Sequence, residues 1–463
     1  MRSRHTLIAT FGYLAVTLVM TWPLALGLGR DIPSDLGDPV LNCWILGWDM
    51  SHMLRFLSGH LGAFRGFWDA NIYHPEPLAL AYSEHLLPQA FQALPLYALT
   101  GRLVLCHNVL FLSTFVLSGL GVFLLVREIT GSPRAAFVSG LVYAFAPYRI
   151  AQYNHLQVLS SQWMPFALYG LSRHFTTRRL LPLAGAALAV AVQGLSCGYY
   201  LLFFPPFVAA YAVFEAIERG VLAEARFLRS MGLAAAATIA ATIPFLRPYL
   251  AVRSVGGILR APWEVEQFSA DVLSYLTAPP GQRLWGALLR AYPRPECALF
   301  PGVVPILLAA AGVAAHARSR WASTRGLPLA AGPLRRAGGA LSVALACVAL
   351  FQAVVILGLL AGLPMTMPGL SVRSLARAAL TLVVSVVALL VISPRARAVV
   401  RGEDGGSAVT FLLAATIAAF ALSLGPTIAT GGRPLGVGPY AWLYDHVPGF
   451  HRCRFAASSR ECP

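Results

Sequence analysis

The sequence contains no lysine, and acidic residues are scarce, with 19 in a chain of 463. Charged residues make up only 12% of the chain, whereas a typical soluble globular domain carries about 25%. This shortage argues against a soluble protein. All 35 basic residues are arginine, and they account for the formal net charge of +16.

That positive charge does not indicate a nucleic-acid partner, because no basic stripe interleaved with aromatic residues is present. The arginines instead form short clusters between apolar runs, as the positive-inside rule predicts for cytoplasmic loops beside anionic lipid headgroups. The seven cysteines form no CxxC pair and no zinc spacing. Cys453 and Cys462 could pair outside the cytoplasm or stay free.

The abundant feature is apolar sequence: 57% of residues are hydrophobic, and the mean hydropathy is +0.66. Because blocks of about 20 apolar residues match the hydrocarbon core, we predict an all-α polytopic membrane protein with about 11 transmembrane helices. The first block is longer than a typical signal-peptide core, which favours a span with a cytoplasmic N-terminus over a cleaved leader. The predicted spans are about 7–28, 103–126, 135–150, 158–171, 180–195, 199–217, 231–250, 298–315, 340–363, 379–392 and 408–424.

With the arginine clusters placed inside, 13 of the 19 acidic residues fall outside the membrane. Most of them lie in two external loops, 30–102 and 251–297, which are therefore the predicted site within a membrane domain of residues 1–426. The remaining segment, 427–463, is predicted to lie outside as well. Because the chain stops at SRECP in a segment that resembles a loop leading into another helix, one interpretation is a truncated gene product.

The first external loop begins with GDPVLN, which is typical of a helix start with Asp38 as N-cap and a proline after it. The helix that follows is apolar on most sides, as expected for one at a membrane surface. Asp38, Asn42, Asp49 and His52 are spaced so that they share one helix face. We predict that this polar line faces an aqueous cavity, although capping alone could explain Asp38.

Further along the same loop, His74, Glu84 and His85 are candidate contacts for a sugar, an acceptor or a metal. Glu84 with His85 could bind a divalent cation or orient a substrate hydroxyl, or both could belong to an ordinary solvated loop. The proline-broken segment 86–100 is predicted to be re-entrant or peripheral. His155, at the outer end of a predicted span, is interpreted as lining the cavity.

Two arginines, Arg373 and Arg377, are predicted to lie outside, against the positive-inside pattern. Either the local topology differs, or these residues meet an anionic group. A lipid phosphate is the natural candidate, because guanidinium recognises phosphate with a rigid fork of donors.

A first helix, an external loop opening with the aspartate of GDPVLN, two surface helices and many further spans together resemble the GT-C glycosyltransferases. Within that superfamily the chain is most similar to the ArnT-like and Rgt-like bacterial enzymes and to the YfhO-like membrane proteins. The resemblance covers the N-terminal two-thirds best. It implies a polyprenyl-phosphate sugar as donor and transfer to a glycan, lipid or protein on the outer face of the bacterial cytoplasmic (inner) membrane, with Asp38 acting on the acceptor.

Such chemistry needs a carboxylate base, worth about 10²–10⁴-fold in rate, and a cation or metal beside the departing phosphate. Asp38 is the predicted catalytic residue. Asp35 and Asp38 are three positions apart and form no DxD pair, so no metal ligands are assigned and the cofactor stays open. The predicted substrate-binding residues are Asn42, Asp49, His74, Glu84, His85, His155, Arg373 and Arg377.

The alternative functions are a transporter or flippase and a non-catalytic envelope protein. Charged residues within spans are costly and mark ion or substrate pathways. The predicted spans contain almost none, and no internal repeat stands out. This distribution favours chemistry at the surface over transport.

Overall fold

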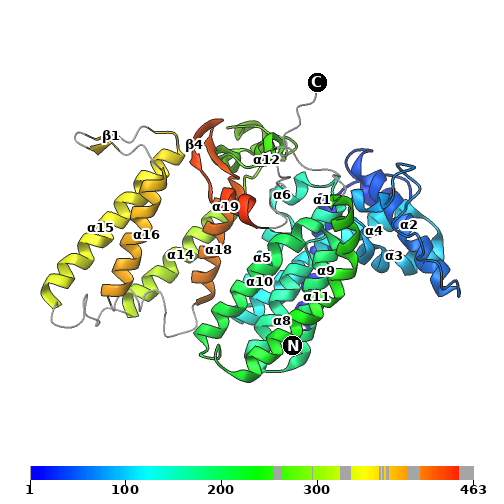
Figure 1. Ribbon diagram of the computed structural model, residues 1–463, viewed down its shortest axis with the longest axis horizontal. Coiled ribbons are helices and arrows are strands. Elements are labelled where there is room, and N and C mark those ends of the chain that lie inside the picture. The colour runs from blue at the N-terminus through cyan, green and yellow to red at the C-terminus, as the bar shows by residue number, and fades with distance from the viewer. Residues whose placement is uncertain are drawn as a thin grey trace. The chain divides into compact units, whose positions relative to one another are not determined.

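The computed structural model describes residues 2–254, 262–294, 296–323, 335–363, 366–367, 370–371, 375–393 and 407–447. The chain divides into two compact units, Met1–Leu259 and Arg260–Pro463. The described residues of both units are mostly helical (Figure 1). The predicted loop 251–297 extends across this division, whereas loop 30–102 lies wholly in the first unit.

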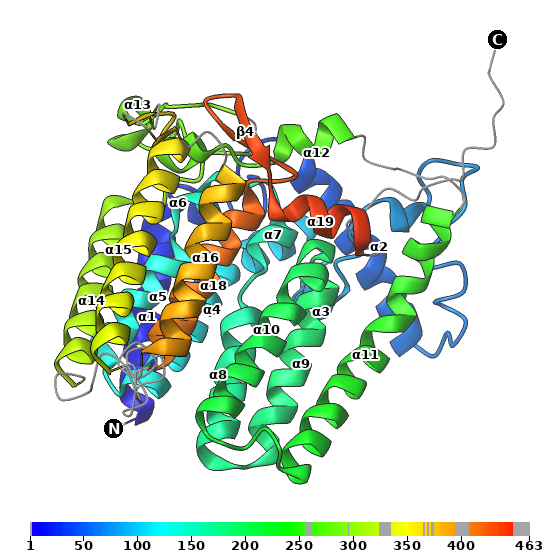
Figure 2. The ribbon, with the colours of Figure 1, turned by 60° about the vertical axis from the view of Figure 1, so that its left-hand side comes forward.

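The first unit is built around α4, which packs against α1, α2, α3, α5 and α8. A second group forms around α9, which contacts α8, α10 and α11 (Figure 2). The helices are α1 (Arg2–Met20), α2 (Asp38–Leu57), α3 (Leu87–Thr100), α4 (Leu103–Thr130), α5 (Pro133–Ala144), α6 (Pro147–Ala151), α7 (Leu156–Leu159), α8 (Trp163–Thr177), α9 (Leu180–Ser196), α10 (Gly198–Glu218) and α11 (Ala225–Ser254), with 3-10 turns η1 (Leu24–Leu26) and η2 (Ala79–Tyr82).

Four helical stretches in the described residues are long and apolar enough to cross a membrane. They are Leu103–Thr130, Gly198–Glu218, Ala225–Val252 and Leu341–Leu360. Shorter apolar helices cover Leu180–Ser196, Arg377–Leu389 and Ala408–Ser423. A helical protein with membrane-length apolar helices is therefore confirmed, while the number of about 11 spans stays a prediction.

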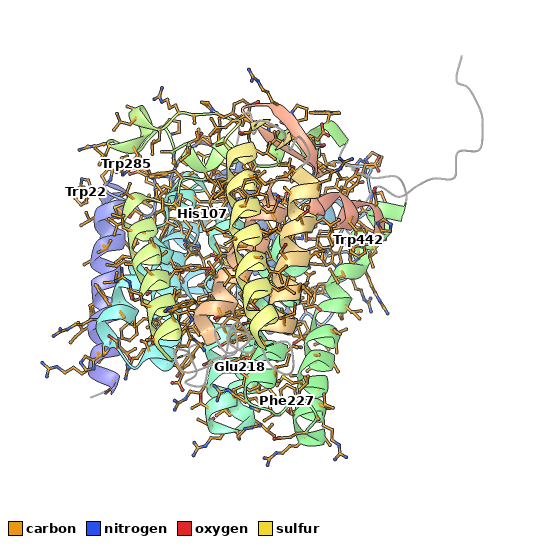
Figure 3. All side chains as sticks on the ribbon, turned by 90° about the vertical axis from the view of Figure 1, so that its left-hand side faces the viewer. Trp22, His107, Glu218, Phe227, Trp285 and Trp442 are labelled. Carbon is orange, nitrogen blue, oxygen red and sulfur yellow. The ribbon has the colours of Figure 1, made fainter. Side chains whose placement is uncertain are left out.

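Several helix ends differ from the prediction because of proline. The predicted span 7–28 is helical only to Met20, since Pro23 has no N–H to continue the ladder. The predicted span 135–150 ends as α5 at Ala144, and a separate short helix begins at Pro147. Figure 3 shows Trp22 and His107 toward one end of the first unit and Glu218 and Phe227 toward the other.

The largest apolar core of the first unit joins α2, α3 and α4. Phe111 and Phe115 of α4 are fully buried in it, and their rings meet edge to face at 5.4 Å. Leu46 and Met50 contribute from α2, and both are completely enclosed. This packing fixes one side of α2, so that its position relative to the bundle is set by apolar contacts.

The second unit contains α12 (Pro262–Phe268), η3 (Val272–Leu276), α13 (Trp285–Leu288), α14 (Val303–Ser323), α15 (Arg335–Leu360), α16 (Leu375–Ile392), α18 (Ser407–Ser423) and α19 (Pro439–His446). Helices α15 and α16 pack side by side (Figures 1 and 2). Two antiparallel hairpins pair β1 (Thr366–Met367) with β2 (Leu370–Ser371) and β3 (Thr427–Thr430) with β4 (Arg433–Val437). These hairpins depart from the all-α prediction.

A buried carboxylate fixes the β3–β4 turn in the second unit. Asp271 accepts backbone hydrogen bonds from Leu273 at 2.8 Å and from Gly431 and Gly432 at 2.9 Å each. Both glycines have positive φ, 56° and 77°, which presents their adjacent N–H groups to one carboxylate. Asp271 is thus a structural residue of the hairpin.

Candidate functional site

The start of α2 differs from the predicted cap. Gly37 is the N-cap residue, and the Asp38 side chain makes no capping hydrogen bond. The Gly37 N–H instead donates to Asp35 Oδ1 at 2.8 Å, and this hydrogen bond stabilises the turn that precedes the helix. The assignment of Asp38 as N-cap was therefore wrong, and its carboxylate is available for a distant partner.

That partner is His155, whose Nε2 lies 2.9 Å from Asp38 Oδ2. The imidazole is mostly covered, with 18% of its side chain exposed, whereas the Asp38 side chain is 46% exposed. The other ring nitrogen of His155, Nδ1, contacts Gln152 Oε1. The result is a chain of amide, imidazole and carboxylate that ends on the half-exposed side chain of Asp38.

One turn further along α2, Asn42 contacts the polar segment 152–157, which also contains His155. Asn42 Nδ2 donates to Gln157 Oε1 at 3.3 Å, and Asn42 is buried. The segment 152–157 therefore contacts α2 at two successive turns through side chains about 115 residues apart in sequence. The structure therefore brings three of the predicted site residues, Asp38, Asn42 and His155, to one place on the protein.

The second half of the polar line is buried instead of facing water. Asp49 is completely enclosed, and neither carboxylate oxygen has a hydrogen-bond partner among the described residues. Burial raises the pKa of Asp49 well above its usual range. His52 is also buried, with Nδ1 2.8 Å from the Trp48 carbonyl oxygen. The prediction that the whole line faces an aqueous cavity is wrong for these residues.

Asp38 and Asp49 cannot contact the same small group. They are eleven positions apart on one helix, which corresponds to roughly 16 Å along its axis. The carboxylate of Asp49 therefore belongs to a separate, enclosed location, and only Asp38 is placed to meet a ligand from solution.

A cleft of about 120 Å³ begins one turn after Asp38 on α2. It lies between α2 and the segment that leads through η2, and its walls are largely aromatic and apolar. The volume is below the roughly 300–1,000 Å³ of a drug-sized ligand site, so the cleft suits one ring or a short chain segment. It is lined by Leu41, Trp44, Ile45, Ile72, Tyr73, Ala79, Leu80, Tyr82 and Ser83.

Glu84, next to this cleft, binds a helix N-terminus. Both of its carboxylate oxygens lie 3.0 Å from the backbone N–H of Gly198, the first residue of α10. Negative charge is favoured there by the helix dipole. Burial nevertheless raises the pKa of Glu84 to about 7, and the Gly198 hydrogen bond only partly offsets that effect.

His85 does not join Glu84 in a metal site. Its ring is buried, 5.8 Å from Trp68 and 5.7 Å from Phe245 between ring centroids. Nδ1 accepts a hydrogen bond from the Leu87 N–H, and burial lowers the pKa of His85 to about 4. No group of three or more His, Cys, Asp or Glu side chains suited to a metal occurs in the described part of the chain.

The remaining predicted residues lie elsewhere. His74 is exposed on the loop before η2. Arg377 is an exposed residue in the first turn of α16, in the second unit. Arg373 lies outside the described residues.

Arg149 is not among the site residues predicted from the sequence, because it was placed at the end of the predicted span 135–150. Arg149 is buried, and its guanidinium donates to the Ala144 carbonyl at 3.1 Å and to the hydroxyl of Ser161. The signal that could have found it is a single arginine within the otherwise apolar and aromatic sequence around it, where charge is costly.

The fold and this site together define a helical protein with membrane-length helices and a carboxylate–imidazole pair beside an aromatic cleft. Comparison with protein-family models, curated proteins and solved structures finds no match for the chain.

Proposed function

We propose that this chain transfers a sugar from a polyprenyl-phosphate donor to an acceptor hydroxyl on the outer face of the bacterial cytoplasmic membrane. The Asp38–His155 pair carries the proposal, because it holds a half-exposed carboxylate one helical turn from an aromatic cleft. The membrane-length helices and the resemblance to GT-C glycosyltransferases support a lipid-linked donor and a cytoplasmic N-terminus.

In the proposed reaction, Asp38 takes the proton of the acceptor hydroxyl while the hydroxyl oxygen bonds to the anomeric carbon. The bond from that carbon to the phosphate oxygen breaks, and its electron pair leaves with the polyprenyl phosphate. Such a single displacement inverts the anomeric carbon. His155 orients the carboxylate, and the reaction also needs a cation beside the departing phosphate.

The test is sugar incorporation by membranes that contain the protein and a polyprenyl-phosphate sugar. Asp38→Asn keeps the size of the side chain but removes the base, so we expect incorporation to fall about 10²–10⁴-fold. Asp35→Asn is the matched control, because Asp35 is an exposed acid three positions away that binds only a neighbouring N–H in the described structure.

Unchanged incorporation by a folded Asp38→Asn variant would end the catalytic assignment. Passage of the lipid-linked sugar across proteoliposomes without any transferred product would instead establish a flippase.

A further inference from the structure

We infer that Arg149 is a positioning residue, which fixes the connection that carries His155 to Asp38. Its effect on sugar transfer rests on the proposed function, whereas its effect on the contact between His155 and Asp38 does not. In the described part of the chain, Arg149 is not among the residues that line the cleft, and the ion pair of Asp38 is made with His155.

The guanidinium of Arg149 links three segments. Nε donates to the carbonyl of Ala144 at the end of α5, at 3.1 Å. Nη1 donates to the hydroxyl of Ser161 just before α8, and Nη2 donates to the Thr114 carbonyl of α4 at 3.4 Å. One side chain therefore ties both ends of the connection 145–162 to the central helix α4.

The surroundings of Arg149 suit a planar guanidinium group. Its guanidinium carbon lies 5.4 Å from the centroid of Phe115 and 5.7 Å from that of Tyr143, which are cation–π distances. In the described structure no carboxylate pairs with it, so carbonyl oxygens, a hydroxyl and ring faces compensate the charge. A lysine ammonium is a compact charge that lacks the planar fork needed to reach three segments at once.

Between its two ends the connection contains the short helices α6 and α7. After His155, the side chains of Tyr200 and Gln193 also donate to the carbonyls of Val158 and Ser160. Before His155, Arg149 ties α6 to the end of α5 and to α4. Gln152 and His155 lie in the turn between them and meet α2 there. If the ends are released, His155 can shift relative to Asp38. Displacements of about 1 Å in a reacting group cost on the order of 10²-fold in rate.

The first experiment measures how close positions 38 and 155 are held to one another. In a full-length chain with its seven native cysteines replaced by alanine, Asp38→Cys and His155→Cys are joined by a short bifunctional thiosulfonate. We expect Arg149→Met, and also Arg149→Lys, to slow this cross-linking several-fold. Arg134→Met, a change at an exposed arginine in the first turn of α5, is the matched control and should leave the rate unchanged.

The second experiment measures sugar transfer in the otherwise native chain. Arg149→Met should lower kcat about 10–100-fold with little change in KM. The same substitution should cost almost nothing further in a His155→Ala background, because Arg149 acts through His155. A general structural role would give equal losses in both backgrounds.

Unchanged cross-linking in the folded Arg149 variants, or additive losses of activity, would overturn the inference. If Arg149→Met does not fold, Arg149→Lys decides the same questions. Cross-linking that depends on Arg149 in a protein without sugar transfer would sustain the positioning role and reject the proposed function.

Discussion

Replacing Asp49 by asparagine should change how stability depends on pH. Asp49 is completely buried, and burial raises its pKa well above the unfolded value. A carboxyl group whose pKa is higher in the folded state stabilises the fold at low pH. That contribution is lost as pH rises from the unfolded pKa toward the folded one.

The magnitude follows from the linkage relation. One pH unit in that window costs up to about 1.4 kcal/mol, so the wild type should lose up to about 2.7 kcal/mol between pH 5 and pH 7 through Asp49 alone. The Asp49→Asn variant has nothing to ionise at this position. For a unit of this size that upper bound corresponds to a gain in relative Tm of at most about 10 °C over those two pH units.

The assay is thermal unfolding of both proteins in detergent at pH 5, 6 and 7, followed by tryptophan fluorescence. Glu84, whose pKa burial raises to about 7, titrates in both proteins and therefore cancels in the comparison. Parallel Tm curves for the two proteins would refute the reasoning, because they would mean that Asp49 is ionised throughout or is stabilised by a partner.

Two further predictions concern buried hydrogen bonds. Asp271→Ala should destabilise the second unit by roughly 3–5 kcal/mol, because three backbone N–H groups lose a buried carboxylate. Chemical denaturation measures this loss, and Asp445→Ala, at an exposed position, should stay within about 0.5 kcal/mol of the wild type. Asn108→Ala should cost about 1–3 kcal/mol and increase proteolysis of the loop before α2, because Asn108 donates to the carbonyls of Leu28 and Asp31. Unchanged protease sensitivity of that loop would argue against this restraint.

The sequence predicted the helices well, because apolar runs of this length have few other structures available. A described helix overlaps each predicted span, and the predicted spans 7–28 and 135–150 end early, near Pro23 and Pro147. The polar spacing on α2 also predicted correctly which residues share a face. What covers that face could not be predicted, since Asp38 and Asp49 are the same residue type in the same pattern, but Asp49 is buried and Asp38 is partly exposed.

The contacting pairs at the site could not be predicted from the sequence, because the two residues of each pair are distant in the chain. His155 was selected as a cavity residue, yet no local pattern indicates that its ring meets Asp38, 117 positions earlier. Glu84 was expected to act with its neighbour His85, but it binds Gly198, 114 positions away. In both cases tertiary packing selected one of several chemically reasonable partners.

The segment beside the cleft is attached to two of the membrane-length helices. Ser83 lines the cleft, and its carbonyl accepts the Tyr249 hydroxyl of α11 at 2.9 Å, while the adjacent Glu84 is bonded to the first residue of α10. A tilt of either helix must then move one wall of the cleft or break a hydrogen bond. In a bilayer, a hydrophobic mismatch that tilted α10 or α11 would therefore change the width of the cleft.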